Sequence, residues 1–227
     1  MNIEKEIEKC EISLKQIKQY DPDPFYVNYF FDQYISSIDK IIIGIFEEAD
    51  RDFGLFLAGS ITEENFQEKA KSKNDKNAIK FSEWFKTKYA EEHKNPYPNF
   101  MSKICNYRKK FEKLPDLKIM IRASDRYKDD INQEIQVPLK NEKLRSKDEL
   151  DIEIKRQLPV FLEIINHKRR EKNEPKVEDN QIIASSFLNI ENHKNIEVVY
   201  ASEIYIPVIK RLVEEARTKI QDLIRNN

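Results

Sequence analysis

Residues 24–53 read PFYVNYFFDQYISSIDKIIIGIFEEADRDF, and this stretch decides the fold class of the chain. Its apolar side chains recur at steps of three and four residues: Phe30, Tyr34, Ile38, Ile41, Ile45, Ala49 and Phe53. Further residues widen this apolar stripe: Phe25, Phe31, Ile42, Phe46 and Phe56. A helix that is apolar around much of its girth is normally buried among other elements. The stretch therefore predicts the central helix of a helical bundle.

Further helices are predicted on both sides of this central helix. The preceding segment has one narrow apolar stripe at helical spacing: Ile3, Ile7, Cys10, Leu14 and Ile17. Prolines 22 and 24 separate the two helices, because proline is tolerated in the first turn of a helix but not in its interior. Later segments repeat the helical spacing: a short one after Thr62, then 78–89 and 100–114. We expect residues 1–114 to form one bundle.

The hydrophobic period changes after Pro115. Apolar residues alternate with polar ones at 117–121 and 135–139, which indicates two strands, and Pro138 favours an edge position for the second. A helical pattern follows at 150–165, interrupted by Pro159, and two more strands are expected at 182–190 and 196–200. The predicted fold is mainly α: a multi-helix bundle (1–114), a mixed α/β insert (115–201) and a closing helix (202–227) that packs on the bundle.

Composition excludes several classes of protein. Lys plus Arg is 40 and Asp plus Glu is 41, and this balance argues against a nucleic-acid binder held by bulk positive charge. The chain has three glycines, which are too few for a Walker loop or a dinucleotide fingerprint. The longest apolar run, Ile41–Phe46, is far too short to span a bilayer. Two cysteines and the lack of an apolar leader suggest a soluble protein of the cytoplasm.

No catalytic or metal motif is found in the sequence, and we expect neither a metal nor a cofactor. The three histidines, His93, His167 and His193, lack the glutamate spacing of di-iron bundles and zinc enzymes, and we expect them on the surface. Glu48 and Asp52 share one helix face, which we interpret as solvated. Cys10 and Cys105 are interpreted as core residues, because each lies beside apolar positions.

Two basic runs are the candidate binding residues. They are Arg108-Lys109-Lys110 and Lys168-Arg169-Arg170, and either run can contact phosphate. Glu112 and Glu171 follow the two runs closely, so a solvated face that alternates in charge is the competing interpretation.

Part of the chain resembles the HEPN superfamily of helical bundles. The residues that carry the resemblance are 25–34 (FYVNYFFDQY), 81–85 (FSEWF), Asn95-Pro96 and Asn106-Tyr107-Arg108, within 24–114. The resemblance implies a bundle, often dimeric, in proteins that cleave or bind RNA, bind nucleotides or mediate assembly. Catalytic members carry Arg followed after four to six residues by His. Arg108 matches the arginine, but Lys113, Leu114 and Pro115 stand where the histidine belongs, so the resemblance implies a lost nuclease centre.

Three functions follow from these observations. We favour a non-catalytic binding or assembly module, either a two-fold homodimer or a protein that docks a partner. The first alternative is a metal-independent RNase that pairs Arg108 with His93. The second is a small-ligand or nucleotide binder. The bundle core is expected to bury the following side chains: Phe30, Tyr34, Ile38, Ile41, Ile45, Phe85, Ile104 and Phe111.

Overall fold

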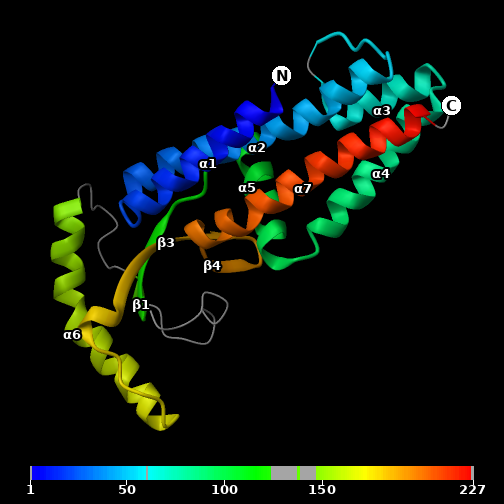
Figure 1. Ribbon diagram of the computed structural model, residues 1–227. Coiled ribbons are helices and arrows are strands. Elements are labelled where there is room, and N and C mark those ends of the chain that lie inside the picture. The colour runs from blue at the N-terminus through cyan, green and yellow to red at the C-terminus, as the bar shows by residue number, and fades with distance from the viewer. Residues whose placement is uncertain (1, 60, 124–136, 139–146, 226–227) are drawn as a thin grey trace. The chain divides into compact units, whose positions relative to one another are not determined.

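The computed structural model describes residues 2–59, 61–123, 137–138 and 147–225 (Figure 1). Its helices are α1 (Ile3–Tyr20), α2 (Pro24–Asp52), α3 (Glu63–Ser72), α4 (Lys76–Glu92), α5 (Pro96–Phe111), α6 (Lys147–Glu171) and α7 (Val198–Arg225). Its strands are β1 (Lys118–Ala123), β2 (Val137–Pro138), β3 (Ile182–Ile190) and β4 (His193–Glu197). The predicted fold class is confirmed, since the chain is mainly helical with a smaller strand-bearing region. No helix within the described ranges is long and apolar enough to cross a lipid bilayer.

The chain forms two compact units, and each unit collects segments that are distant in the sequence. Unit 1 contains Met1–Ser13, Gln33–Asn106 and Ser202–Asn227, and unit 2 contains Leu14–Asp32 and Tyr107–Ala201. The helices α1, α2, α5 and α7 each pass from one unit into the other. The boundaries of the units therefore fall inside helices and not in loops.

Unit 1 is helical, and its core is made by the apolar faces that periodicity identifies. Ile41 and Ile45 of α2 are buried, as are Ile104 of α5 and Leu212 of α7. A cluster of phenylalanine rings fills the space between α2, α3 and α4: Phe46, Phe66, Phe81 and Phe85. Burial of one such ring contributes roughly 1.5–3 kcal/mol, so this cluster stabilises the packing of the three helices.

Helix starts in unit 1 are fixed by side-chain caps. Thr62 and Asn65 form a reciprocal capping box at α3, with the Asn65 backbone N–H donating to Thr62 Oγ1 at 3.3 Å. At α4 the Asp75 carboxylate accepts hydrogen bonds from the backbone N–H groups of Asn77 and Ala78. Each cap satisfies backbone donors that have no partner within the helix.

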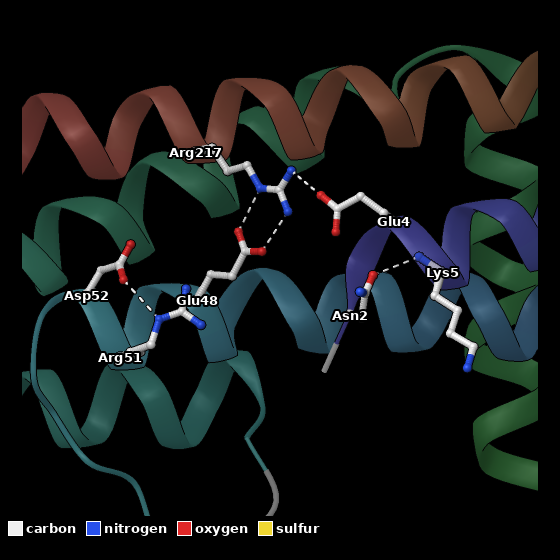
Figure 2. A network of polar contacts seen from close by, with 7 residues as sticks. All are labelled: Asn2, Glu4, Lys5, Glu48, Arg51, Asp52 and Arg217. Carbon is white, nitrogen blue, oxygen red and sulfur yellow. Dashed lines mark hydrogen bonds and ion pairs between the residues drawn. The ribbon is translucent and has the colours of Figure 1, made fainter.

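Charged side chains connect α7 to α1 and α2 within unit 1. Figure 2 shows Arg217 between Glu48 and Glu4. Arg217 donates from Nε to Glu48 Oε2 at 2.8 Å and from Nη2 to Oε1 at 2.6 Å, and its Nη1 lies 2.7 Å from Glu4 Oε1. These carboxylates raise the pKa of the Arg217 guanidinium. The interpretation of Glu48 as part of a solvated face is therefore wrong, since it joins two helices.

Unit 2 contains an antiparallel sheet with the strand order β2-β1-β3-β4. β2 is an edge strand, as predicted from Pro138. Successive residues of β1 point to opposite faces, so Ile121 packs against Phe161 and Ile165 of α6 while Met120 packs with Phe187 on the other side. The α6 helix therefore covers one face of this sheet, and it does so through the apolar residues that recur at helical spacing between 150 and 165.

The linker between α1 and α2 is attached to the sheet of unit 2. The Asp21 carboxylate accepts a hydrogen bond from the Ser186 backbone N–H of β3 at 2.8 Å. Burial, and to a smaller extent the neighbouring carboxylate of Glu197, raise the pKa of this carboxyl to about 6. The Asp21 carboxyl thus holds the helix junction to the sheet.

Three details of the predictions are wrong. The last hairpin turns at residues 191–192, so its second strand begins at His193 and not at 196, and α7 begins at Val198 where a strand was expected. The β-branched residues at 198–199 favour a strand, but both are buried in a helix, so packing overrides their local preference. Phe30 is only half-buried and Phe111 is 48% exposed, and both belong to unit 2 and not to the helical core of unit 1.

Candidate functional site

Five aromatic rings form a partly exposed cluster at the junction of α1 and α2 in unit 2. The rings are in continuous contact: Tyr20 stacks on Tyr26 (centroids 4.5 Å apart) and on Phe30 (5.7 Å), Phe25 meets Tyr26 (5.3 Å), and Tyr29 meets Phe30 (5.2 Å). We call these residues the aromatic cluster. Phe25 is 66% exposed and Tyr29 is 54% exposed. A contiguous exposed group of large rings normally marks a recognition surface.

The local sequence explains why these rings face outward. Asp23 caps α2, and its Oδ1 accepts the backbone N–H groups of Phe25 at 3.0 Å and Tyr26 at 3.2 Å. This cap fixes the first turn of α2. Val27 and Phe31, four residues apart, then take the buried side of the helix, so Phe25 and Tyr29 are left on the open side.

Arg108 connects the aromatic cluster to the basic end of α5. It donates to both carboxylate oxygens of Asp32, from Nε at 2.6 Å and from Nη2 at 3.0 Å. Asp32 lies one turn after Tyr29, and Phe111 lies one turn after Arg108. The ion pair therefore joins the aromatic start of α2 to the end of α5, where Lys110 lies over the Phe111 ring at 5.1 Å.

We call the combined feature the aromatic–basic surface. The name covers the aromatic cluster, the Asp32–Arg108 ion pair and the exposed residues that follow Arg108 in the chain: Lys109, Lys110, Phe111, Glu112 and Lys113. Four cations are set against two carboxylates, although the chain as a whole has a net charge of −1. Exposed rings beside lysine and arginine can stack nucleobases while the cations contact phosphates.

His93 is not a surface residue, and that prediction is wrong. Its side chain belongs to unit 1 and is 6% exposed. Nδ1 donates to the Tyr89 carbonyl at 2.6 Å, which leaves Nε2 to accept from the Tyr205 hydroxyl at 2.9 Å. Burial lowers the pKa of this imidazole. His93 is therefore held neutral inside the bundle, with both ring nitrogens occupied, and is poorly suited to transfer protons to a substrate.

The second basic run is divided among three environments. Lys168 is exposed, Arg169 is buried with Nη1 donating to the Pro175 carbonyl at 3.4 Å, and Arg170 lines a cleft. The other residues of this cleft are Leu162, Glu163, Asn166, His167 and Lys176. Neighbours in the sequence are separated here because successive residues of a helix lie about 100° apart.

No metal site is found in the described part of the chain, where no three His, Cys, Asp or Glu side chains gather suitably. Cys10 and Cys105 are both buried, as predicted for core thiols, and burial raises the pKa of Cys10 to about 12. Neither thiol is therefore a ready nucleophile.

Sequence reasoning missed two groups of residues. Phe25 was placed in the core stripe, because periodicity cannot tell which face of an amphipathic helix lacks a neighbour. Lys176 lies in the loop after α6 and lines the cleft beside that helix, a contact for which the sequence gives no local signal. The i, i+4, i+7 spacing of Glu163, His167 and Arg170 was the available indication that these residues share a face.

In comparisons with known proteins, no family model, curated protein or solved structure matches this chain.

Proposed function

We propose that the chain is a non-catalytic binding module that holds single-stranded RNA on its aromatic–basic surface. The proposal keeps the HEPN-like interpretation of residues 24–114, in which Arg108 is the matching arginine. It also includes a cytoplasmic location, which suits a protein with two free thiols.

One observation carries the proposal: the Arg108–Asp32 ion pair joins exposed rings to a run of cations. Base stacking on an aromatic side chain contributes about 1–3 kcal/mol per base and tolerates any base, because every base has a π-face. Phosphate contacts by the lysines add affinity that falls with salt. The surface therefore suits an unpaired strand better than a duplex, whose bases are already stacked.

The geometry favours binding over cleavage. Two nitrogens of Arg108 are used to hold Asp32, and His93 is buried with both nitrogens bonded. Metal-independent cleavage needs acid and base groups that reach the ribose and titrate near neutral pH. Neither residue of the RNase alternative fits that requirement.

The test is fluorescence anisotropy with a labelled single-stranded oligouridine, measured over a series of salt concentrations. Phe25→Ala and Tyr29→Ala should each weaken binding by about 5- to 100-fold if each ring stacks one base. Lys110→Gln should reduce the slope of log affinity against log salt by about 0.7, the value for one phosphate contact on a single strand.

Phe56→Ala is the matched control, because Phe56 is 78% exposed and belongs to unit 1. It should leave the affinity unchanged. Unaltered RNA binding in both Phe25→Ala and Tyr29→Ala would refute the proposal. If the same variants instead lower the mass of the particle in light scattering, the aromatic–basic surface is a protein interface.

Self-association is the second candidate function, and α6 carries the observation that favours it. On this helix the side chains of Ile152, Val160 and Ile164 are exposed. Together with Arg156 they follow one i, i+4 row, the kind of ridge that packs into the groove of another helix. A two-fold dimer through α6 predicts a doubled mass at micromolar concentration, reduced to one chain by Val160→Asp. A strictly monomeric wild type would exclude it.

A further inference from the structure

The cleft beside the end of α6 is a second candidate site, independent of the aromatic–basic surface. It has a volume of about 400 Å³ and lies in unit 2 between the helix and the loop that follows it. Cavities of roughly 300–1,000 Å³ accommodate small ligands.

Hydrogen bonds hold the loop wall of the cleft against the helix. Asn166 accepts from the Val177 backbone N–H at 2.7 Å and donates to the Val177 carbonyl at 3.1 Å. The buried Arg169 donates to the Pro175 carbonyl. Lys176 lies between these two anchored residues, so its backbone position is fixed on both sides.

The cleft is cationic, and two of its cations are uncommitted. Among the described residues, neither Arg170 nor Lys176 makes a hydrogen bond or ion pair through its side chain. The third basic residue of the lining, His167, has its Nε2 atom 3.5 Å from Oε1 of Glu171, and Glu171 does not line the cleft. The lining contains one carboxylate, that of Glu163. Arginine and lysine that converge on a hollow without partners suit a phosphate group, which accepts several charge-assisted hydrogen bonds.

The C-terminus of α6 lies near the cleft and repels an anion, but hydrogen bonds to its free carbonyls reduce this repulsion. The C-terminus of a helix carries partial negative charge on its free carbonyls. Here the backbone N–H groups of Lys172, Asn173 and Glu174 donate to the carbonyls of Arg169 and Arg170. Two full positive charges therefore outweigh the residual dipole.

We propose that this cleft binds a small hydroxylated phosphate monoester of the sugar-phosphate class. Arg170 and Lys176 hold the phosphate, and Glu163 accepts hydrogen bonds from the hydroxyl groups. Leu162 is the sole apolar side chain that lines the described cleft, and the imidazole of His167 is the sole ring that lines it. The lining therefore offers little contact to a nucleobase, and the sugar and phosphate supply the binding energy.

Isothermal titration calorimetry with ribose 5-phosphate tests the proposal, with ribose and adenosine 5′-monophosphate as comparisons. Ribose 5-phosphate should bind, ribose should not, and the nucleotide should bind no tighter than the sugar phosphate. Arg170→Gln and Lys176→Gln should each weaken binding by at least about tenfold, because each removes a charge-assisted contact.

Lys168→Gln is the matched control, since it removes the same charge from the exposed part of α6 outside the cleft. It should leave the dissociation constant unchanged. Equal losses in Lys168→Gln and Arg170→Gln, or no heat with ribose 5-phosphate at millimolar concentration, would overturn the proposal. Tighter binding of the nucleotide would overturn the sugar-phosphate assignment. Oligouridine affinity should be the same in Arg170→Gln as in wild type, which keeps this test separate from that of the aromatic–basic surface.

Discussion

His93 and His167 show how differently unit 1 and unit 2 use the same side chain. His93 is enclosed in unit 1, where Nδ1 bonds to a carbonyl of its own helix, α4, and Nε2 bonds to Tyr205 of α7. His167 lines the cleft in unit 2, with 70% of its side chain exposed. The first is part of the packing, and the second is available to a ligand. The difference between the two histidines comes from their packing, because each unit buries some polar side chains, such as His93 in unit 1 and Arg169 in unit 2.

The aromatic residues repeat this contrast. Phe46 and Phe85 are enclosed in unit 1, with their centroids 4.8 Å apart. Phe25 and Tyr29 are open to solvent in unit 2. Rings that are already buried stabilise the fold, while exposed rings can still gain contact area from a partner. We therefore expect mutations in unit 1 to change stability and mutations on the described surfaces of unit 2 to change binding.

The largest expected effect is that of Ile41→Ala in the core of unit 1. Ile41 is fully buried, so truncation should reduce the free energy of unfolding by about 2–5 kcal/mol. Urea denaturation followed by circular dichroism measures this change. Ile152→Ala in unit 2 is the control, since that side chain is 66% exposed and should cost less than about 0.5 kcal/mol. A loss below about 1 kcal/mol for Ile41→Ala would contradict its place in the core.

Tyr205→Phe tests the buried polar network of unit 1. It leaves the Nε2 atom of His93 without its donor, and a buried group that loses its partner costs about 1–3 kcal/mol. The same denaturation assay applies, with His167→Ala as the exposed control. If Tyr205→Phe is as stable as wild type, the hydrogen bond to His93 contributes nothing to folding.

Arg217→Met should have a smaller effect and reduce the free energy of unfolding by about 1 kcal/mol. The bidentate contact with Glu48 is partly exposed, so solvent screens much of its attraction. Addition of salt should lower the stability of wild type more than that of Arg217→Met. Equal salt responses would show that Arg217 stabilises unit 1 through its aliphatic stem alone.

The dependence of stability on pH should distinguish the two units by its sign. The pKa of His93 is lowered from 6.5 by burial, so its contribution is present above 6.5 and is lost as the pH falls. The pKa of Asp21 is raised from 3.8 to about 6, so its contribution is present below 3.8 and is lost as the pH rises through about 6. His93→Gln should remove the loss of stability that occurs as the pH falls. Asp21→Asn should remove the loss of stability that occurs as the pH rises toward neutral. Free energies of unfolding between about pH 4 and pH 8 give both slopes.

The smallest expected effect is on RNA integrity. Purified protein incubated with single-stranded RNA in chelator should leave the strand intact on a gel, and Arg108→Ala should behave identically. Cleavage that disappears in Arg108→Ala would restore the RNase alternative.

Most helices and one long strand could be predicted from the sequence, because they depend on local signals. Pro24 begins α2 where the proline pattern places it, and Ile182–Ile190 forms β3 with the predicted bounds. These features need only periodicity and turn chemistry. The candidate site needed more than that, since no local signal identifies which face of a helix stays uncovered.

His93 illustrates why the rest could not be predicted. Its polar neighbours in the sequence suggest exposure, but Tyr205, which encloses it, is 112 residues away along the chain. Arg108 and Asp32 are separated by 76 residues, and their ion pair creates the aromatic–basic surface. Contacts at such separations depend on tertiary packing, which one sequence does not reveal by pattern alone.

The division of the chain into interleaved segments has a consequence for biogenesis. Unit 1 needs Ser202–Asn227 to be complete, so it cannot finish folding when residue 106 leaves the ribosome. At about 5–20 residues per second, the missing segment arrives on the order of 6–24 seconds later. During that interval α7 has not been synthesised, so the apolar side chains of α2 that it covers remain exposed while residues 107–201 are made. The nascent chain is thus a natural client for chaperones that shield hydrophobic helices.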